Sequence, residues 1–158
     1  MTTVAIGADH AGFAYKERIK ELLASMGVEV RDFGTSSDAS TDYPDYAHSV
    51  AQAVGSGEAS YGILVCGSGI GMSIVANKHA GVRAVNTESV DGAKLARQHN
   101  DANVLALGAR LTSWEKAREI IAAFLATPFE GGRHRSASTR STLSPTFDTD
   151  HEPPSERR

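Results

Sequence analysis

The sequence predicts an α/β fold: one doubly wound domain with a five-stranded parallel sheet, followed by a polar C-terminal tail. Five short apolar runs alternate with stretches of helical periodicity. This alternation is typical of a parallel sheet with helices on both faces and right-handed crossovers. The chain has 158 residues, 41% of them hydrophobic and 22% charged, which fits one globular domain and is too short for two ordinary ones.

The predicted strands are short apolar runs that end in glycine or polar residues. The run at 63–66, Ile-Leu-Val-Cys, contains no polar position. Such a run is typical of a central strand that helices cover on both faces. In chain order, strands are expected at residues 4–8, 28–33, 63–66, about 82–85 and 104–107.

Helical periodicity and capping signals predict the helices between these strands. Residues 13–26 carry apolar side chains at helical spacing, with lysine, arginine and glutamate on the other face. Asp42 followed by Pro44 predicts the cap and first turn of a second helix. A further helix is expected over about 88–97. The Thr-Ser-Trp-Glu sequence at 112–115 resembles a capping box and predicts the start of the last helix.

The composition changes near the C-terminus. After Gly131-Gly132 the chain is mostly serine, threonine, proline, arginine and acidic residues, with Leu143 and Phe147 as its large apolar groups. Such a segment buries too little surface to order itself. We therefore expect the folded domain over 1–135 and a polar, disordered tail over 136–158.

Charge and hydropathy exclude several classes of function. The net charge is −3 and both signs alternate along the first 130 residues, whereas nucleic-acid binders gather basic residues on one face. No apolar run approaches the roughly 20 residues needed to span a bilayer. The N-terminus lacks a secretory signal, and one cysteine cannot form an internal disulfide. We expect a cytoplasmic protein that binds neither nucleic acid nor membrane.

The turn after the first strand places a carboxylate and an imidazole side by side. In doubly wound sheets ligands bind beyond the carboxyl ends of the strands, so these turns are where a site is expected. Asp9 and His10 lie in the sequence Gly-Ala-Asp-His-Ala-Gly at 7–12. Asp9 could simply cap the next helix, but the adjacent His10 favours binding of a phosphate or hydroxyl group.

The turn after the third strand combines a thiol with a glycine-rich loop. Cys66 is followed by Gly67, Gly69 and Gly71. A backbone with so few side chains can direct several N–H groups at one anion or oxyanion. The positive end of the following helix favours the thiolate of Cys66, which can then remove a proton from carbon. The alternative is a buried structural cysteine over a tight turn.

Histidines supply the remaining candidates. His99 precedes an apolar strand in the polar sequence Arg-Gln-His-Asn-Asp and titrates near neutral pH, which suits acid–base exchange with a sugar oxygen, although a structural role is also open. His48, His79 and His151 lack the spacing of metal ligands, and one cysteine excludes the usual zinc–thiolate clusters. We predict no metal and no cofactor.

Six motifs together resemble ribose-5-phosphate isomerase B, over about 134 residues. They are Gly-Ala-Asp-His-Ala-Gly at 7–12, Thr-Asp-Tyr-Pro at 41–44, Cys-Gly-Ser-Gly-Ile-Gly at 66–71, Asn-Lys at 77–78, Arg-Gln-His-Asn-Asp at 97–101 and Glu-Gly-Gly-Arg-His at 130–134. The same superfamily holds isomerases of allose 6-phosphate and galactose 6-phosphate. The resemblance implies a Rossmann-like fold and a homodimer with active sites at the subunit interface, with dimer or tetramer left open. It also implies interconversion of ribose 5-phosphate and ribulose 5-phosphate.

The resemblance also implies a role for each site residue. Cys66 would be the base that moves a proton between C1 and C2, and His99 of the other subunit would open the sugar ring. The enediolate would be held by Ser68 and by the backbone amides of Gly67, Ser68, Gly69, Ile70 and Gly71. The sugar hydroxyls or ring oxygen would be contacted by Asp9, His10, Tyr43 and Asn100, and the phosphate by Arg110 and Arg133.

Two positions mark how this chain differs from relatives with the same motifs. Some members use a glutamate four positions after the residue matching Ser68, whereas this chain has Met72 there, which places it with the cysteine-based members. The family pattern places a second arginine four residues beyond Arg133, where this chain has Ala137. Arg135 or Arg140 could replace that arginine, or phosphate could bind more weakly.

Two other functions remain open from the sequence. A dinucleotide-dependent oxidoreductase is suggested by the first strand, its glycine turn and Asp32 about 20 residues after Gly12, but the required glycine spacing is absent. A non-catalytic protein that senses sugar phosphates would share the same binding groups. The preferred sugar, with five or six carbons, is not determined by the sequence.

Overall fold

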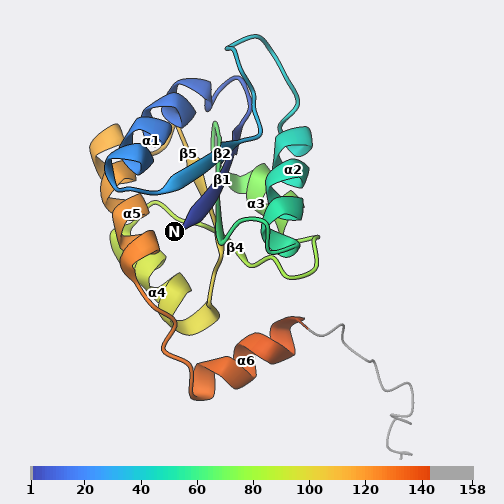
Figure 1. Cartoon of the computed structure of the whole chain (residues 1–158), viewed down its shortest axis with the longest axis vertical. Coiled ribbons are helices and arrows are strands. Elements are labelled where there is room, and N and C mark those ends of the chain that lie inside the picture. Colours follow the sequence, from blue (N-terminus) through green and yellow to red (C-terminus); the bar gives the residue numbers. More distant parts are fainter. Residues whose placement is uncertain (1, 143–158) are drawn as a thin grey trace, which may run out of the picture.

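The computed structural model describes residues 2–142 and confirms the α/β fold with a five-stranded parallel sheet (Figure 1). The strand order is β2-β1-β3-β5-β4, and every neighbouring pair is parallel. The strands are β1 (Thr3–Ala8), β2 (Glu29–Asp32), β3 (Tyr61–Cys66), β4 (Ala84–Asn86) and β5 (Val104–Gly108). Each lies within a few residues of its predicted position.

Helices cover both faces of the sheet, as expected for a doubly wound fold. The helices α1, α4 and α5 pack on one face, and α2 and α3 on the other. Their bounds are α1 (Phe13–Ser25), α2 (Tyr43–Gly55), α3 (Ile70–Ala76), α4 (Val90–Asn100), α5 (Trp114–Ala126) and α6 (Arg133–Thr142). No helix within residues 2–142 is both long enough and apolar enough to cross a membrane.

The central strands supply two separate apolar cores because successive side chains point to opposite faces. In β3, Ile63 and Val65 face the core beneath α1, α4 and α5, whereas Leu64 and Cys66 face the core beneath α2 and α3. All four side chains are buried. The prediction that the uninterrupted apolar run at 63–66 is a strand covered on both sides is therefore confirmed.

The structure differs from the sequence prediction at two helix starts. The last core helix, α5, is capped by Ser113, whose Oγ accepts a hydrogen bond from the Lys116 N–H. Thr112, the expected capping residue, is buried one position earlier. Asp42 does precede α2, and Pro44 lies in its first turn, but the Asp42 side chain makes no capping hydrogen bond.

The C-terminal segment also differs from the prediction. Residues 136–142, expected to belong to a disordered tail, form most of α6, which packs against α4. Ser138 is buried, and its hydroxyl donates to the carbonyl of Asn100. Composition failed here because a single small buried side chain can fix a polar helix on a folded domain. The rest of the predicted tail, 143–158, lies outside the described residues.

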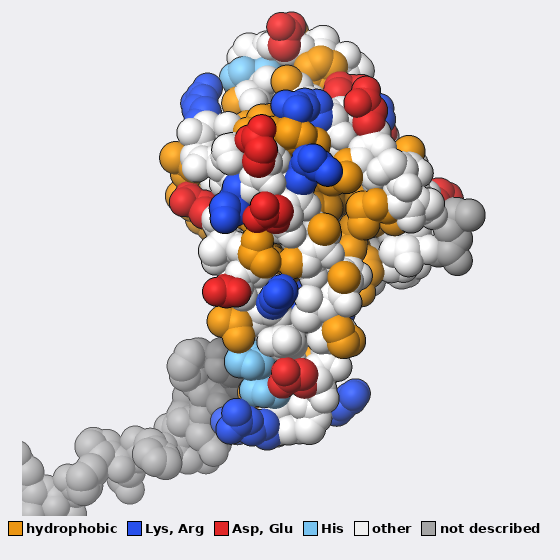
Figure 2. All heavy atoms as spheres, turned by 90° about the vertical axis from the view of Figure 1, so that its left-hand side faces the viewer, with side chains coloured by type: hydrophobic (Ala, Val, Ile, Leu, Met, Phe, Trp, Pro, Cys, Tyr) orange, Lys and Arg blue, Asp and Glu red, His pale blue; other side chains and the backbone are white. Residues whose placement is uncertain are grey.

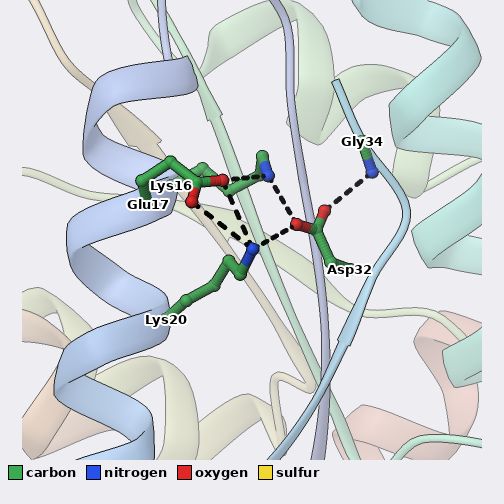
Figure 3. Close-up of polar contacts among 5 residues, drawn as sticks. All are labelled: Lys16, Glu17, Lys20, Asp32 and Gly34. Carbon is green, nitrogen blue, oxygen red and sulfur yellow. Dashed lines mark hydrogen bonds and ion pairs between the residues drawn. The ribbon is translucent and has the colours of Figure 1, made fainter. Parts of the chain in front are cut away.

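A charged cluster ties α1 to the end of β2 (Figure 3). Lys16 is fully buried, and its Nζ lies 2.7 Å from Asp32 Oδ2 and 2.9 Å from Glu17 Oε1. Lys20 Nζ also contacts Asp32 Oδ2 at 2.7 Å, and the Gly34 N–H donates to Oδ1 at 2.8 Å. A buried ammonium requires such partners because its desolvation is costly.

The cluster shifts the pKa of three of its members. Burial raises the pKa of Asp32, but hydrogen bonds from Lys16, Lys20 and the Gly34 N–H outweigh this and lower it overall. The hydrogen bond from Lys16 lowers the pKa of Glu17, and the bond to Asp32 raises that of Lys20. Asp32 is thus held by two lysines rather than available to a ribose hydroxyl, which weakens the dinucleotide hypothesis.

Candidate active site

The candidate site lies where the direction of strand addition reverses. From β1 the chain passes to β2 on one side, and β3 is then added on the other side of β1. The crevice at such a point, outside the carboxyl ends of the strands, is the usual ligand site of open α/β sheets. A cleft of about 340 Å³ occupies this position. Its lining consists of Asp9, Tyr43, Cys66, Gly67, Ser68, Gly71, Arg110 and Leu111.

The cleft brings together residues from four loops or element ends. Asp9 follows β1, Cys66 ends β3, Arg110 follows β5 and Tyr43 begins α2. All of the lining residues except Leu111 are among those that the sequence predicts for the site. They converge because the carboxyl ends of parallel strands lie at the same edge of the sheet.

Cys66 is held by the loop that follows it. Its side chain is almost completely buried, with a residue exposure of 6%, yet it borders the cleft. The N–H of Gly69 donates to Cys66 Sγ at 3.0 Å. This hydrogen bond fixes the direction of the sulfur at the edge of the cleft.

Two glycines of this loop lie in close contact with neighbouring groups. Gly69 has a φ of +79°, and a Cβ there would lie 2.3 Å from Asn86 Nδ2 and 2.9 Å from the Leu107 carbonyl carbon. At Gly71 a Cβ would lie 2.7 Å from the Tyr43 ring. The loop is therefore fixed between β5 on one side and the Tyr43 ring on the other.

Part of the predicted oxyanion cradle already has partners within the chain. The Gly69 N–H faces Cys66 Sγ, and the Ile70 N–H donates to Ser68 Oγ at 3.2 Å. In this arrangement these two amides orient the Cys66 thiol and the Ser68 hydroxyl instead of pointing at a bound anion.

Asn86 is a site-supporting residue that the sequence analysis missed. Its Nδ2 donates to the carbonyls of Ser68 and Ala106, both at 3.1 Å. The side chain thereby joins the loop after β3 to β5. A sequence signal did exist, since an asparagine directly follows the apolar run at 82–85, at the carboxyl end where sites are expected.

Asp9 and His10 are both fixed by backbone groups. Asp9 Oδ1 accepts hydrogen bonds from the N–H groups of Ala11 and Gly12, at 3.0 and 3.1 Å. Asp9 therefore braces its own turn and does not cap α1, whose N-cap is Gly12 without a side-chain hydrogen bond, and the residue also lines the cleft. The Thr41 N–H lies 3.2 Å from His10 Nδ1, which ties the loop before α2 to the turn after β1.

Arg110 lies over the glycine loop. Its N–H donates to the Gly67 carbonyl at 3.1 Å. A Cβ placed on Gly67 would lie 3.1 Å from Arg110 Nη1, so the guanidinium packs directly on this glycine. An exposed cation in the lining of the cleft suits a phosphate or a developing oxyanion.

His99, Asn100 and Arg133 do not reach this cleft. His99 and Asn100 form the end of α4, four residues before β5 begins, whereas Cys66 pairs with Gly108 at the far end of β5. The four steps from Val104 to Gly108 alone advance about 13 Å at about 3.3 Å per residue. Arg133 begins α6, which packs on α4. Within one chain the predicted residues therefore form two groups, one beyond the carboxyl ends of the strands and one near their amino ends.

The second group has its own geometry. The rings of His99 and His134 are stacked, with centroids 4.2 Å apart and planes 12° apart. His134 Nε2 lies 3.5 Å from Glu130 Oε2. Asn100 borders a separate hollow of about 510 Å³, lined also by His79, Arg83 and Ser141. Within residues 2–142, the set His99, Glu130 and His134 is the one group of three potential metal ligands.

The model of the Ribose/Galactose Isomerase family matches residues 4–140. The chain belongs to this family. Ribose-5-phosphate isomerase B of Escherichia coli is 52% identical over 135 residues, which cover 85% of this chain and 91% of that protein. D-erythrulose-4-phosphate isomerase of Pectobacterium atrosepticum is 44% identical over 133 residues, covering 84% and 88%.

Solved structures of isomerases agree with the fold. The ribose 5-phosphate isomerase of Thermotoga maritima superimposes with a TM-score of 0.86 at 50% identity, over 88% of this chain and 96% of that one. The type B enzyme of Trypanosoma brucei gives 0.87 at 50% identity, over 90% and 98%. The predicted resemblance and the fold class are confirmed, and the protein is an isomerase. The match to residue 140 includes most of α6, in agreement with the structure.

Proposed function

We propose that this isomerase interconverts D-ribose 5-phosphate and D-ribulose 5-phosphate through an enediolate. The observation that carries the proposal is the placement of Cys66 Sγ at the cleft, with the Ser68 hydroxyl and the Arg110 guanidinium beside it. An aldose–ketose shift needs a base at carbon and donors for the developing oxyanion. The names of relatives and of solved structures support the choice of ribose 5-phosphate.

In the proposed mechanism the thiolate of Cys66 removes the proton from C2 of the open-chain aldose. The electron pair forms the C1–C2 double bond, and the C1 carbonyl π pair moves to O1, which gives the enediolate. Ser68 and Arg110 stabilise the negative oxygen. The O2 proton passes to O1, the C2–O2 π bond forms, and the C1–C2 π pair takes the proton from the Cys66 thiol at C1, which gives the ketose and restores the thiolate. Met72 is fully buried in the apolar core, so position 72 offers no base and Cys66 takes this role.

We assign ring opening to His99 of a second copy of the chain. His99 lies near the amino ends of the strands and Cys66 at their carboxyl ends, so a single chain cannot place both on one sugar. A homodimer in which the α4 end of one copy meets the cleft of the other removes this difficulty. Asn100 would accompany His99 to the sugar.

The surroundings of the cleft support a contact with another copy. Tyr43, Ile70, Ile74 and Leu111 are large apolar residues with exposures of 39–55%. Ile70 and Ile74 lie one helical turn apart on α3, and Tyr43 and Leu111 line the cleft itself. Apolar residues at the rim of a polar site are typical of a protein–protein interface.

Phosphate binding is assigned to Arg110 of one copy and Arg133 of the other, with His10 nearby on the first. Arg133, Ala137 and Arg140 share one face of α6, because residues at i, i+4 and i+7 lie along a single stripe. Arg140 can therefore supply the second guanidinium that the family pattern places at position 137. We further propose a cytoplasmic location, because the reducing conditions there keep a thiol such as Cys66 free.

Turnover of ribose 5-phosphate by the purified protein, in the presence of a metal chelator, tests the proposal. Formation of ribulose 5-phosphate would support it, and binding without turnover would favour a non-catalytic sensor. Parallel assays with allose 6-phosphate, galactose 6-phosphate and erythrulose 4-phosphate determine the preferred sugar. A thermal shift on addition of NAD would instead support the dinucleotide hypothesis.

A further inference from the structure

A group of side chains with metal-binding chemistry lies where α4 ends and α6 begins. It consists of His99, Glu130 and His134, and one potential ligand atom from each lies within 4.8 Å of the others. The two histidines are half-buried and Glu130 is exposed. Figure 2 shows histidine and acidic side chains together at the lower end of the molecule, flanked by basic ones.

Secondary structure holds the three residues in place. His99 is the penultimate residue of α4, and His134 lies in the first turn of α6. The Glu130 N–H donates to the Gln98 carbonyl at 3.2 Å, which fixes the connecting loop against α4. Two helix ends and a loop that a backbone hydrogen bond ties to α4 therefore assemble the group.

We propose that this group binds a transition-metal ion, Zn²⁺ in particular, and that the bound ion inhibits the isomerase. Two imidazoles and one carboxylate form a donor set that zinc favours, with a fourth position left for water. The C-terminal end of α4 also attracts a cation through the helix dipole. The inhibitory part rests on the proposed function of His99, because a ring that the ion holds beside Glu130 and His134 is not free to reach the sugar.

Binding requires a small rearrangement of the side chains. Zinc lies about 2.0–2.2 Å from nitrogen and oxygen ligands, so the donor atoms of a tetrahedral site are about 3.3–3.6 Å apart. The stacked rings must turn about their Cβ–Cγ bonds, a torsion with a broad range in histidine. The exposed Glu130 side chain can follow. Arg133 and Arg135 in the same segment repel a cation and limit the affinity.

The chain carries a second histidine pair that serves as a matched control. His48 Nδ1 on α2 lies 2.7 Å from His79 Nε2 in the loop after α3. In the described part of the chain this pair belongs to no group of three potential ligands. If two close histidines were sufficient, this pair would bind metal as well as the His99 group does.

Metal binding is measured directly on chelator-stripped full-length protein without substrate. Zn²⁺ is titrated by calorimetry and Co²⁺ by its visible absorption, with the parent, Glu130→Gln, His134→Asn and His79→Asn. We expect one ion bound per chain, a Kd raised about 10-fold or more in the first two variants, and no change in His79→Asn. Unchanged binding in Glu130→Gln, or loss of binding in His79→Asn, would overturn the site. Circular dichroism checks that each variant is folded.

The inhibitory role is measured by activity. We expect Zn²⁺ to inhibit the parent, a chelator to restore turnover, and Glu130→Gln to need about 10-fold more Zn²⁺ for half-inhibition. Full turnover of the parent with Zn²⁺ bound would overturn the inhibitory role. Because the metal titrations contain no substrate, failure to isomerise ribose 5-phosphate would count against the proposed function alone.

Discussion

At the residue scale, the cleft depends on a thiol held by its own loop. Cys66 receives the Gly69 N–H, Ser68 receives the Ile70 N–H, and Asn86 holds the Ser68 carbonyl. Each of these bonds fixes the direction of a group that the proposed chemistry uses. Small changes at this loop should therefore affect turnover more than stability, except where the backbone itself has no room.

We expect Cys66→Ala to abolish isomerisation while substrate still binds. Loss of a general base typically lowers the rate by about 10²–10⁴-fold, and the phosphate contacts are made by other residues. Steady-state kinetics and calorimetry with a non-reactive sugar-phosphate analogue measure the two effects. Activity within threefold of the parent would refute Cys66 as the base.

Gly69→Ala and Gly71→Ala should separate stability from substrate binding. A side chain at Gly69 meets both a positive φ and the Leu107 backbone, so Gly69→Ala should lower the free energy of unfolding by about 1–3 kcal/mol or more. At Gly71 the new methyl group meets the movable Tyr43 ring.

Gly71→Ala should consequently raise KM with little change in the midpoint of denaturant unfolding. Urea titrations and kinetics on both variants check the contrast. Equal destabilisation by the two substitutions would show that Tyr43 cannot move and that the loop is rigid at both positions.

At the element scale, α6 is the main difference between the structure and the tail predicted after residue 135. Arg133, Ala137 and Arg140 lie on one exposed stripe, whereas Ser138 faces α4. The helix therefore holds Arg133 and Arg140 in a fixed spatial relation. Ala137, where the family pattern has an arginine, lies between them.

Ala137→Arg should lower KM for ribose 5-phosphate about 10-fold with little change in kcat. A hydrogen bond to a charged group contributes about 1.5–3 kcal/mol, and phosphate binding acts equally on ground and transition states. Arg140→Ala should have the opposite effect if Arg140 replaces the missing arginine. No response of KM to either substitution would place the phosphate elsewhere.

The charged cluster between α1 and β2 gives a pH-dependent contribution to stability. The lowered pKa of Asp32 means that its contribution is present above the ordinary aspartate pKa, near 3.8, and is lost as pH falls below it. The raised pKa of Lys20 has the opposite sign, so its contribution is present below 10.5 and is lost at higher pH.

Asp32→Asn should lower the free energy of unfolding at pH 7 by roughly 3 kcal/mol, because it leaves the buried Lys16 with Glu17 alone. The variant should also lose less stability than the parent between pH 5 and about pH 3. Urea unfolding at several pH values measures both effects, with the exposed loop variant Asp38→Asn as control. Parallel pH profiles for Asp32→Asn and the parent would contradict the assignment.

At the scale of the whole molecule, the separation of Cys66 from His99 makes assembly the central question. Cys66 lies at the carboxyl ends of the strands and His99 near their amino ends, and the sheet is too rigid to bring the two residues together. The proposed site is therefore complete only when two copies meet.

Mixing two inactive variants tests this arrangement. A heterodimer of Cys66→Ala and His99→Asn chains would hold one site with both residues intact and one site with neither. After denaturation and refolding as an equal mixture, about half of the dimers are mixed, so activity should return to about one quarter of the parent value. No recovery, with dimers formed, would contradict a shared site.

The sequence by itself determined the α/β fold and most of the cleft. Apolar runs and helical periodicity fix the alternation of strand and helix, and parallel strands bring their carboxyl ends to one edge. Asp9, Cys66 and Arg110 meet for this reason, although they are far apart in the chain. The glycines at 67, 69 and 71 likewise predicted a loop that directs backbone N–H groups at an anion, although two of these amides have partners within the loop.

Only the tertiary structure decided which groups lie apart and which pair unexpectedly. His99 lies near the amino ends of the strands, away from Cys66, because α4 is long enough to return the chain to the start of β5. The fold of 136–142, the bracing by Asn86 and the stacking of His99 on His134 depend on contacts between distant segments. Local sequence patterns carry no record of such contacts, because packing between segments, rather than the composition of either one, determines them.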